Sequence, residues 1–200
     1  MMSPNGLLHR RAVVEELLRD RGDMLVVAGL GAPAWDITAA GDHPRNFPLW
    51  GAMGGATTVG LGLALAQPET PVMVITGDGE MLMGLGSLAT VAVAQPRNLT
   101  LVVLDNEHYG ETGMQRTHTG FGVDLRGAAA AAGFWTARRI DAPEHVRSLR
   151  DLAHGRSGPV FAQVKIDPEK LPLVLPPSDG SHLKHRMREA VLGPQAAHYA

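Results

Sequence analysis

The stretch VMVITGDGE at residues 72–80 carries the clearest fold signal in the chain. Its first five residues form a continuous apolar run, which is typical of a strand buried on both faces of a parallel sheet. A second apolar run, LTLVVL at 99–104, follows a segment at 83–94 whose apolar composition predicts a helix. A strand, a helix and a second strand in this order predict two parallel neighbours joined by a right-handed crossover.

The same alternation continues on both sides of this unit. Further apolar runs predict buried strands, and the segments between them predict helices. The expected strands are 24–28, 134–140 and 160–166, and the expected helices are 7–20, 32–40, 55–66, 125–132 and 144–153. This pattern predicts an α/β fold with a doubly wound parallel sheet sandwiched by helices.

The composition excludes several classes of protein. The 200 residues have a formal net charge of −2 and no block of like charges, so we expect neither nucleic acid nor a membrane surface as a partner. The absence of cysteine excludes disulfides, thiolate metal sites and thiol nucleophiles. No apolar run approaches the roughly 20 residues of a membrane span, and the first residues lack a signal peptide's apolar stretch. We therefore expect a cytoplasmic protein.

Polar residues and glycines follow the two central strands, at the sheet edge where ligands bind in such folds. Gly77-Asp78-Gly79-Glu80 follows the first strand, and Asp105-Asn106 follows the second. The Asp78 carboxylate and the Asn106 amide should lie side by side, and an all-oxygen set suits Mg²⁺ or Ca²⁺. Because Mg²⁺ usually bridges to phosphates, the two glycines would let backbone N–H groups approach a phosphorylated ligand.

These residues resemble the signature of the thiamine-diphosphate-dependent enzymes, in which GDG precedes an apolar strand and asparagine. The stretch GDGEMLMGLGSLATVAVAQPRNLTLVVLDNEHYGETGMQ at 77–115 is similar throughout to the sulfopyruvate and phosphonopyruvate decarboxylases of that family. The resemblance covers about residues 7–167, although Asp105 stands where the family usually has a first asparagine. It implies a diphosphate-binding (PP) domain over residues 1–175, followed by a peripheral tail at 176–200 with one short helix.

The resemblance also implies roles for individual residues. Asp78 and the Asn106 side chain would bind Mg²⁺, with the backbone carbonyl of His108 as a third ligand. Backbone groups near the two strand ends would contact the diphosphate of thiamine diphosphate, namely those of Gly77, Gly79, Glu80, Tyr109 and Gly110.

The segment Gly51-Ala52-Met53-Gly54 matches the part of the family that holds the other end of the cofactor. By this resemblance, the Gly51 carbonyl would accept a hydrogen bond from the pyrimidine amino group. Met53 would force the cofactor into its bent shape, which brings the aminopyrimidine nitrogen to the thiazolium carbon whose proton must leave. Met53 is therefore expected to take part in catalysis as well as in binding.

The family mechanism needs a glutamate that lies on a separate pyrimidine-binding (PYR) domain, and 200 residues hold only one such domain. The resemblance therefore implies a partner subunit that supplies this glutamate, in a hetero-oligomer of at least two heterodimers. The expected activity is Mg²⁺-dependent decarboxylation of a 2-oxo acid, either 3-sulfopyruvate to sulfoacetaldehyde and CO₂, or phosphonopyruvate. The alternatives are an acetolactate-synthase-like carboligase subunit and a non-catalytic regulatory subunit that binds the cofactor.

Three features admit more than one role. The His108 ring could transfer a proton to substrate, or only the His108 backbone could be used. Arg116 and His118 could receive an anionic head group of the substrate, with His118 as a proton carrier, or could lie on a solvated or partner-facing loop. Residues 29–34 imitate a dinucleotide-binding turn, but no acidic residue follows at the required distance, which favours a structural role or a place near the substrate.

Overall fold

A computed structural model describes residues 1–198 of the chain. Six parallel strands form one sheet in the order β2-β1-β3-β4-β8-β7. The strands are β1 (Leu25–Ala28), β2 (Asn46–Pro48), β3 (Val72–Gly77), β4 (Leu99–Asp105), β7 (Thr136–Ile140) and β8 (Val160–Lys165). The expected doubly wound parallel sheet is thereby confirmed.

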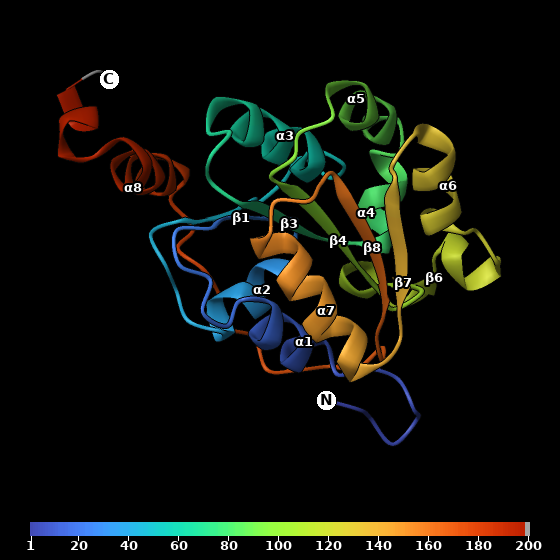
Figure 1. Cartoon of the computed structure of the whole chain (residues 1–200). Helices are drawn as coiled ribbons and strands as arrows, with labels where there is room; N and C mark the ends of the chain where they lie inside the picture. The colour runs from blue at the N-terminus through green and yellow to red at the C-terminus, as the bar shows by residue number, and fades with distance from the viewer. Residues whose placement is uncertain (199–200) are drawn as a thin grey trace.

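Helices cover both faces of this sheet (Figure 1). One face carries α1 (Arg10–Leu17), α2 (Ala32–Ala39) and α7 (Pro143–His154). The other carries α3 (Ala56–Ala66), α5 (Ser87–Ala94) and α6 (Leu125–Ala132).

The alternation of side chains along β3 explains why its sequence is apolar throughout. Met73 and Ile75 pack in the core beneath α1, α2 and α7, whereas Val72 and Val74 pack in the core beneath α3, α5 and α6. Successive strand residues point to opposite faces, so both faces of a strand that is covered on both sides favour apolar side chains.

The structure differs from the sequence expectation in the segment 83–94. The helix expected there begins only at Ser87, as α5, and a separate helix, α4 (Asp78–Met83), begins at the aspartate itself. They are separated at Gly84, where an added Cβ would lie 2.3 Å from the carbonyl oxygen of Gly54. Hydrophobicity alone did not show this break, because its cause is the close passage of a segment 30 residues away in sequence.

Short elements complete the described chain. After β4 come the small hairpin β5 (His108–Tyr109) and β6 (Gln115–Arg116) and the 3-10 helices η1 (Gly110–Thr112) and η2 (His118–Phe121). The sequence analysis missed the three-residue β2 and this hairpin, because runs so short carry no periodic signal. None of the described helices is long and apolar enough to cross a membrane.

The C-terminal segment carries α8 (Gly180–Leu192) and the 3-10 helix η3 (Pro194–His198). Met187 of α8 packs in the core on the α3 side, and the Trp50 indole Nε1 donates a hydrogen bond to the Pro177 carbonyl at 2.8 Å. Residues 199–200 of the expected tail lie outside the described part of the chain. The boundary at residue 175 stays a prediction.

Two glycines in α3 provide a matched test of helix-to-sheet packing. A Cβ at Gly60 would lie 2.1 Å from Val74 Cγ2, whereas a Cβ at Gly62 would have no neighbour within 4 Å. We expect Gly60→Ala to destabilise the fold by about 1–3 kcal/mol through overpacking. Gly62→Ala should raise stability by up to about 1 kcal/mol, since alanine is the better helix former. Urea denaturation of both variants measures the difference, and equal effects would contradict this packing.

Candidate functional site

A cavity of about 620 Å³ opens at the C-terminal ends of the central strands. Its walls come from the turn after β1, the start of α4, the segment after β4 and residues 166–173. Most residues singled out from the sequence meet here: Met53, Gly77, Asp78, Gly79, Glu80, Asn106, His108, Tyr109 and Gly110. Gly51, Arg116 and His118 are not among the lining residues.

Asp78 is the first residue of α4 and only 2% exposed. Its Oδ2 accepts hydrogen bonds from the hydroxyls of Thr117 and Thr119, the latter at 3.0 Å. Burial raises the pKa of Asp78 to about 6, and the nearby Asp105 carboxylate adds to that rise, while the threonine hydroxyls partly offset it. No cationic side chain among residues 1–198 is bonded to Asp78, so its ionised form would be stabilised by a cation in the cavity.

Asn106 directly follows β4. This strand is the parallel neighbour of β3, and Leu104 lies opposite Gly77. The Asn106 Oδ1 accepts the His108 backbone N–H at 2.9 Å, which leaves the second lone pair of this oxygen available. The His108 ring lies 2.7 Å from the Asn106 carbonyl through Nδ1. Because a carbonyl can only accept, Nδ1 carries the hydrogen, and Nε2 of the neutral ring is the acceptor.

The two glycines that flank Asp78 serve different purposes. A Cβ at Gly79 would lie 2.4 Å from the Tyr109 ring, so this glycine allows the β5 hairpin to close over α4. A Cβ at Gly77 would meet nothing within 4 Å, which leaves open space beside the cavity wall.

Glu80 contributes its side chain in a way that the sequence did not indicate. The carboxylate is buried, its Oε2 accepts the Leu30 backbone N–H at 3.1 Å, and burial raises its pKa. A Cβ at Gly29 would lie 1.8 Å from the same oxygen. The glycine-rich turn at 29–31 therefore closes against Glu80, which accounts for its resemblance to a dinucleotide-binding turn.

Arg116 and His118 lie on the hairpin and η2, away from the cavity lining. The Arg116 guanidinium donates to the Gly120 carbonyl and lies 4.5 Å from the centroid of the Phe121 ring. The substrate-binding and proton-transfer roles of these two residues stay predictions, and so does the role of Gly51.

The oxygen donors at the cavity fit a divalent cation. Asp78 supplies a buried carboxylate, Asn106 supplies an amide oxygen, and His108 lines the same wall. Among the described residues, no group of three or more histidine, cysteine or acidic side chains could hold a metal ion. A cation here would therefore depend on this mixed set and on ligand phosphates, as Mg²⁺ commonly does.

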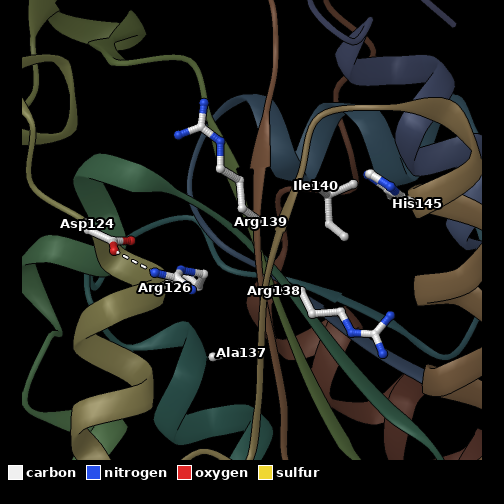
Figure 2. A pocket seen from close by; sticks show the side chains of 7 residues that line it. All are labelled: Asp124, Arg126, Ala137, Arg138, Arg139, Ile140 and His145. Carbon is white, nitrogen blue, oxygen red and sulfur yellow. Dashed lines mark hydrogen bonds and ion pairs between the residues drawn. The ribbon is translucent and has the colours of Figure 1, made fainter.

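A second cavity of about 480 Å³ lies along the free edge of the sheet at β7 (Figure 2). Figure 2 shows Arg138 and Arg139 pointing to opposite sides of the strand. The basic side chains in its lining have partners: Arg126 pairs with Asp124, Arg139 and His145 lie against Asp141, and Arg138 bonds to Ser148. None of the residues singled out from the sequence lines this second cavity, so it is not the candidate site.

Comparisons with known proteins place the chain in a family. Residues 37–164 match the model described as "Thiamine pyrophosphate enzyme, C-terminal TPP binding domain". The chain therefore belongs to the thiamine pyrophosphate enzymes. The fold agrees: benzoylformate decarboxylase from Polynucleobacter necessarius superimposes with a TM-score of 0.66 at 20% identity, over 83% of this chain and 34% of that one.

Two relatives define its position within the family. The chain is 36% identical to sulfopyruvate decarboxylase subunit beta of Methanothermobacter thermautotrophicus, over 94% of this chain and 97% of the relative. It is 38% identical to phosphonopyruvate decarboxylase of Streptomyces viridochromogenes, over 94% of this chain but only 47% of that protein. The chain thus spans nearly all of the first relative and about half of the second.

The raised pKa of Asp78 makes a prediction about stability. Because the folded-state pKa of about 6 lies above the ordinary value of 3.8, ionisation of Asp78 disfavours the folded state at neutral pH. In the presence of a chelator at pH 7, Asp78→Asn should therefore be more stable than the wild type, by about 3 kcal/mol. This advantage should shrink as the pH falls through about 6 towards 4, where the wild-type carboxyl becomes protonated.

Thermal denaturation across this pH range measures the effect. Asp151→Asn on the exposed face of α7 serves as the control and should show no such pH-dependent gain. A variant Asp78→Asn that is less stable than the wild type at neutral pH would contradict the prediction.

Proposed function

We propose that this chain is the PP subunit of a thiamine-diphosphate- and Mg²⁺-dependent 2-oxo acid decarboxylase of the cytoplasm. The observation that carries the proposal is the juxtaposition of Asp78 and Asn106 at the ends of neighbouring strands in one cavity. The identity to sulfopyruvate decarboxylase subunit beta across nearly the whole chain supports it.

The residues present would hold the cofactor as follows. Asp78, the Asn106 side chain and the His108 carbonyl would bind Mg²⁺, and backbone groups from 77–80 and 109–110 would bind the diphosphate. Met53 lines the cavity and would contact the rings. When bound, the thiazolium ring supplies an electron sink for the bonding pair released as CO₂ leaves.

The protein's own groups prepare this chemistry. The burial of Asp78 removes competing water, so its charge interacts strongly with a cation in the cavity. The Asn106 carbonyl fixes the tautomer of His108 through Nδ1, which leaves Nε2 as the atom that could accept a proton near the substrate. His108 is thus the better placed of the two histidines for proton transfer, because His118 lies outside the cavity lining.

An apolar surface at the cavity mouth supports a partner subunit. Met83 at the end of α4 is 59% exposed and lines the cavity together with Met53. Trp50 and Leu85 are exposed on the same two segments, which touch where Gly54 passes Gly84. Exposed apolar side chains gathered in this way are typical of a protein interface. We propose that a PYR-domain subunit covers them and supplies the glutamate, in at least a dimer of heterodimers.

The relatives favour an acidic 2-oxo acid as substrate. Those named for sulfopyruvate and phosphonopyruvate are 36% and 38% identical over 94% of the chain. Acetolactate synthase isozyme 1 large subunit of Escherichia coli is 29% identical over 67% of it. We therefore favour decarboxylation of 3-sulfopyruvate or phosphonopyruvate over carboligation. A scaffold subunit that bound neither metal nor cofactor would have no need of a buried carboxylate facing the cavity, whereas a regulatory subunit that binds the cofactor is tested by turnover.

A reconstitution assay tests the activity. The full chain is combined with a candidate PYR subunit, thiamine diphosphate and Mg²⁺, and CO₂ release is measured with 3-sulfopyruvate, phosphonopyruvate and pyruvate. We expect turnover of one of the two acidic substrates at a kcat/KM well above that for pyruvate. If none of these 2-oxo acids is turned over although the cofactor is bound, the decarboxylase proposal is wrong.

Loss of the Asp78 charge tests the metal site separately. Asp78→Asn should weaken Mg²⁺-dependent binding of thiamine diphosphate by more than about tenfold, because a hard divalent cation loses its only buried carboxylate ligand. Isothermal titration with and without Mg²⁺ measures the change, with Asp151→Asn as the matched control. An unchanged affinity would show that the metal site is wrongly placed.

A further inference from the structure

A chain of buried polar side chains runs behind Asp78, and none of its other members lines the cavity. The Thr119 Oγ1 lies 3.0 Å from Asp78 Oδ2 and 2.8 Å from Asp105 Oδ1, so it bridges two carboxylates. Asp105 is fully buried and pairs in register with Lys165 on β8. The Lys165 ammonium donates to Asp105 Oδ2 at 3.0 Å.

The Thr119 hydroxyl carries one hydrogen, so it can donate to only one of its neighbours. Its possible acceptors are Asp78, Asp105 and the Thr117 hydroxyl at 2.9 Å. The Thr117 hydroxyl itself donates to Asp78 Oδ2. Whichever carboxylate takes the hydrogen, a Thr119 lone pair faces the other one, at 3.0 Å for Asp78 Oδ2 or 2.8 Å for Asp105 Oδ1. The choice therefore depends on which carboxylate has the other donors, and Asp78 would lose one of its two hydroxyl donors if Asp105 took the hydrogen.

Asp105 does not need that hydrogen, because other donors surround it. Its Oδ2 accepts from Gln163 Nε2 at 2.6 Å as well as from Lys165, and its Oδ1 accepts the Glu107 backbone N–H at 3.1 Å. Lys165 also compensates the charge, since it is the cation bonded to this carboxylate. Loss of the Thr119 hydrogen therefore costs Asp105 less than it would cost Asp78, which favours donation to Asp78.

Lys165 is shared with a second carboxylate. Its Nζ donates to Glu107 Oε1 at 2.5 Å, and its side chain is only 10% exposed. One buried ammonium thus fixes both Asp105 and the residue that begins the turn into the β5 hairpin. Because both partners hold it, Lys165 has a single defined position behind the site.

We propose that Asp105, held and partly charge-compensated by Lys165, is a positioning residue for the divalent cation of the proposed cofactor site. Because Lys165 and the other donors weaken its demand for a hydrogen, Asp105 leaves the Thr119 hydrogen to Asp78 Oδ2. Both threonine hydroxyls then donate to Asp78 Oδ2. Within the described part of the chain no side chain donates to Oδ1, so this oxygen is the one available to a cation. This inference rests on the proposed function, because it assigns the cation to Asp78.

The test measures Mn²⁺, as a probe for Mg²⁺, bound to the full chain with thiamine diphosphate, by the electron paramagnetic resonance of free Mn²⁺. Lys165→Met and Thr119→Val should each weaken Mn²⁺ binding by about 10–100-fold, as loss of an outer partner of a metal ligand typically does. Thr119→Ser keeps the hydroxyl and should stay within a few-fold of the wild type. Adding Asp105→Asn to Lys165→Met removes the uncompensated charge and should restore most of the affinity.

Two control variants are matched in residue type and change residues outside this series of hydrogen-bonded side chains. Thr100→Val changes a buried threonine near the start of β4, and Lys184→Met changes an exposed lysine on α8. Both should bind Mn²⁺ as the wild type does. The Tm of every variant is measured in parallel, so that affinity is compared among folded proteins.

Each other outcome overturns the inference. If Lys165→Met and Thr119→Val lower the Tm but bind Mn²⁺ as tightly as the wild type, the chain of side chains serves stability alone. If the double variant binds no better than Lys165→Met, the charge of Asp105 is not what Lys165 offsets. If the wild type itself binds no Mn²⁺ with thiamine diphosphate, the proposed function fails as well. If the wild type binds Mn²⁺ and only the variants behave otherwise than expected, the positioning role of Asp105 fails alone.

Discussion

The position of the Asp78 carboxylate is the constraint on which the rest of the site depends. A carboxylate that is 2% exposed is costly to ionise, and this cost is visible in its pKa of about 6. Two threonine hydroxyls stabilise one oxygen, while the cavity borders the same residue. A cation in the cavity would offset this cost, because it would stabilise the ionised carboxylate.

The sheet brings this carboxylate to its partner. Because β3 and β4 are parallel neighbours, Asp78 and Asn106 emerge at the same edge although a helix-containing crossover separates them in sequence. The loops are then held by close contacts that only glycine allows, at Gly79 against Tyr109 and at Gly84 against Gly54. These contacts bring the Met53 segment and the end of α4 together, and with them the exposed apolar side chains at the cavity mouth.

Much of this could be predicted from the sequence. The continuous apolar strands indicated the fold class, since only a sheet covered on both faces buries them. The positions of Asp78 and Asn106 directly after two such strands predicted that these two residues lie at one edge of the sheet. The end of α4 at Met83 and the late start of α5 could not be predicted, because Gly84 between them packs against the distant Gly54. The side-chain role of Glu80 and the hydrogen bonds of Thr117, Thr119 and Lys165 could not be predicted either, because each joins residues that are far apart in sequence.

The sequence by itself determined the α/β architecture and the family, because hydrophobic periodicity and a spaced motif are local properties of the chain. The tertiary structure alone decided which polar side chains meet. It placed Arg116 over Phe121 and away from the cavity, and it gave Asp105 a buried lysine from β8 as its counter-charge. Hydrogen bonds and ion pairs act over a few ångströms in space, and residues 60 positions apart come within that range only when the sheet has formed.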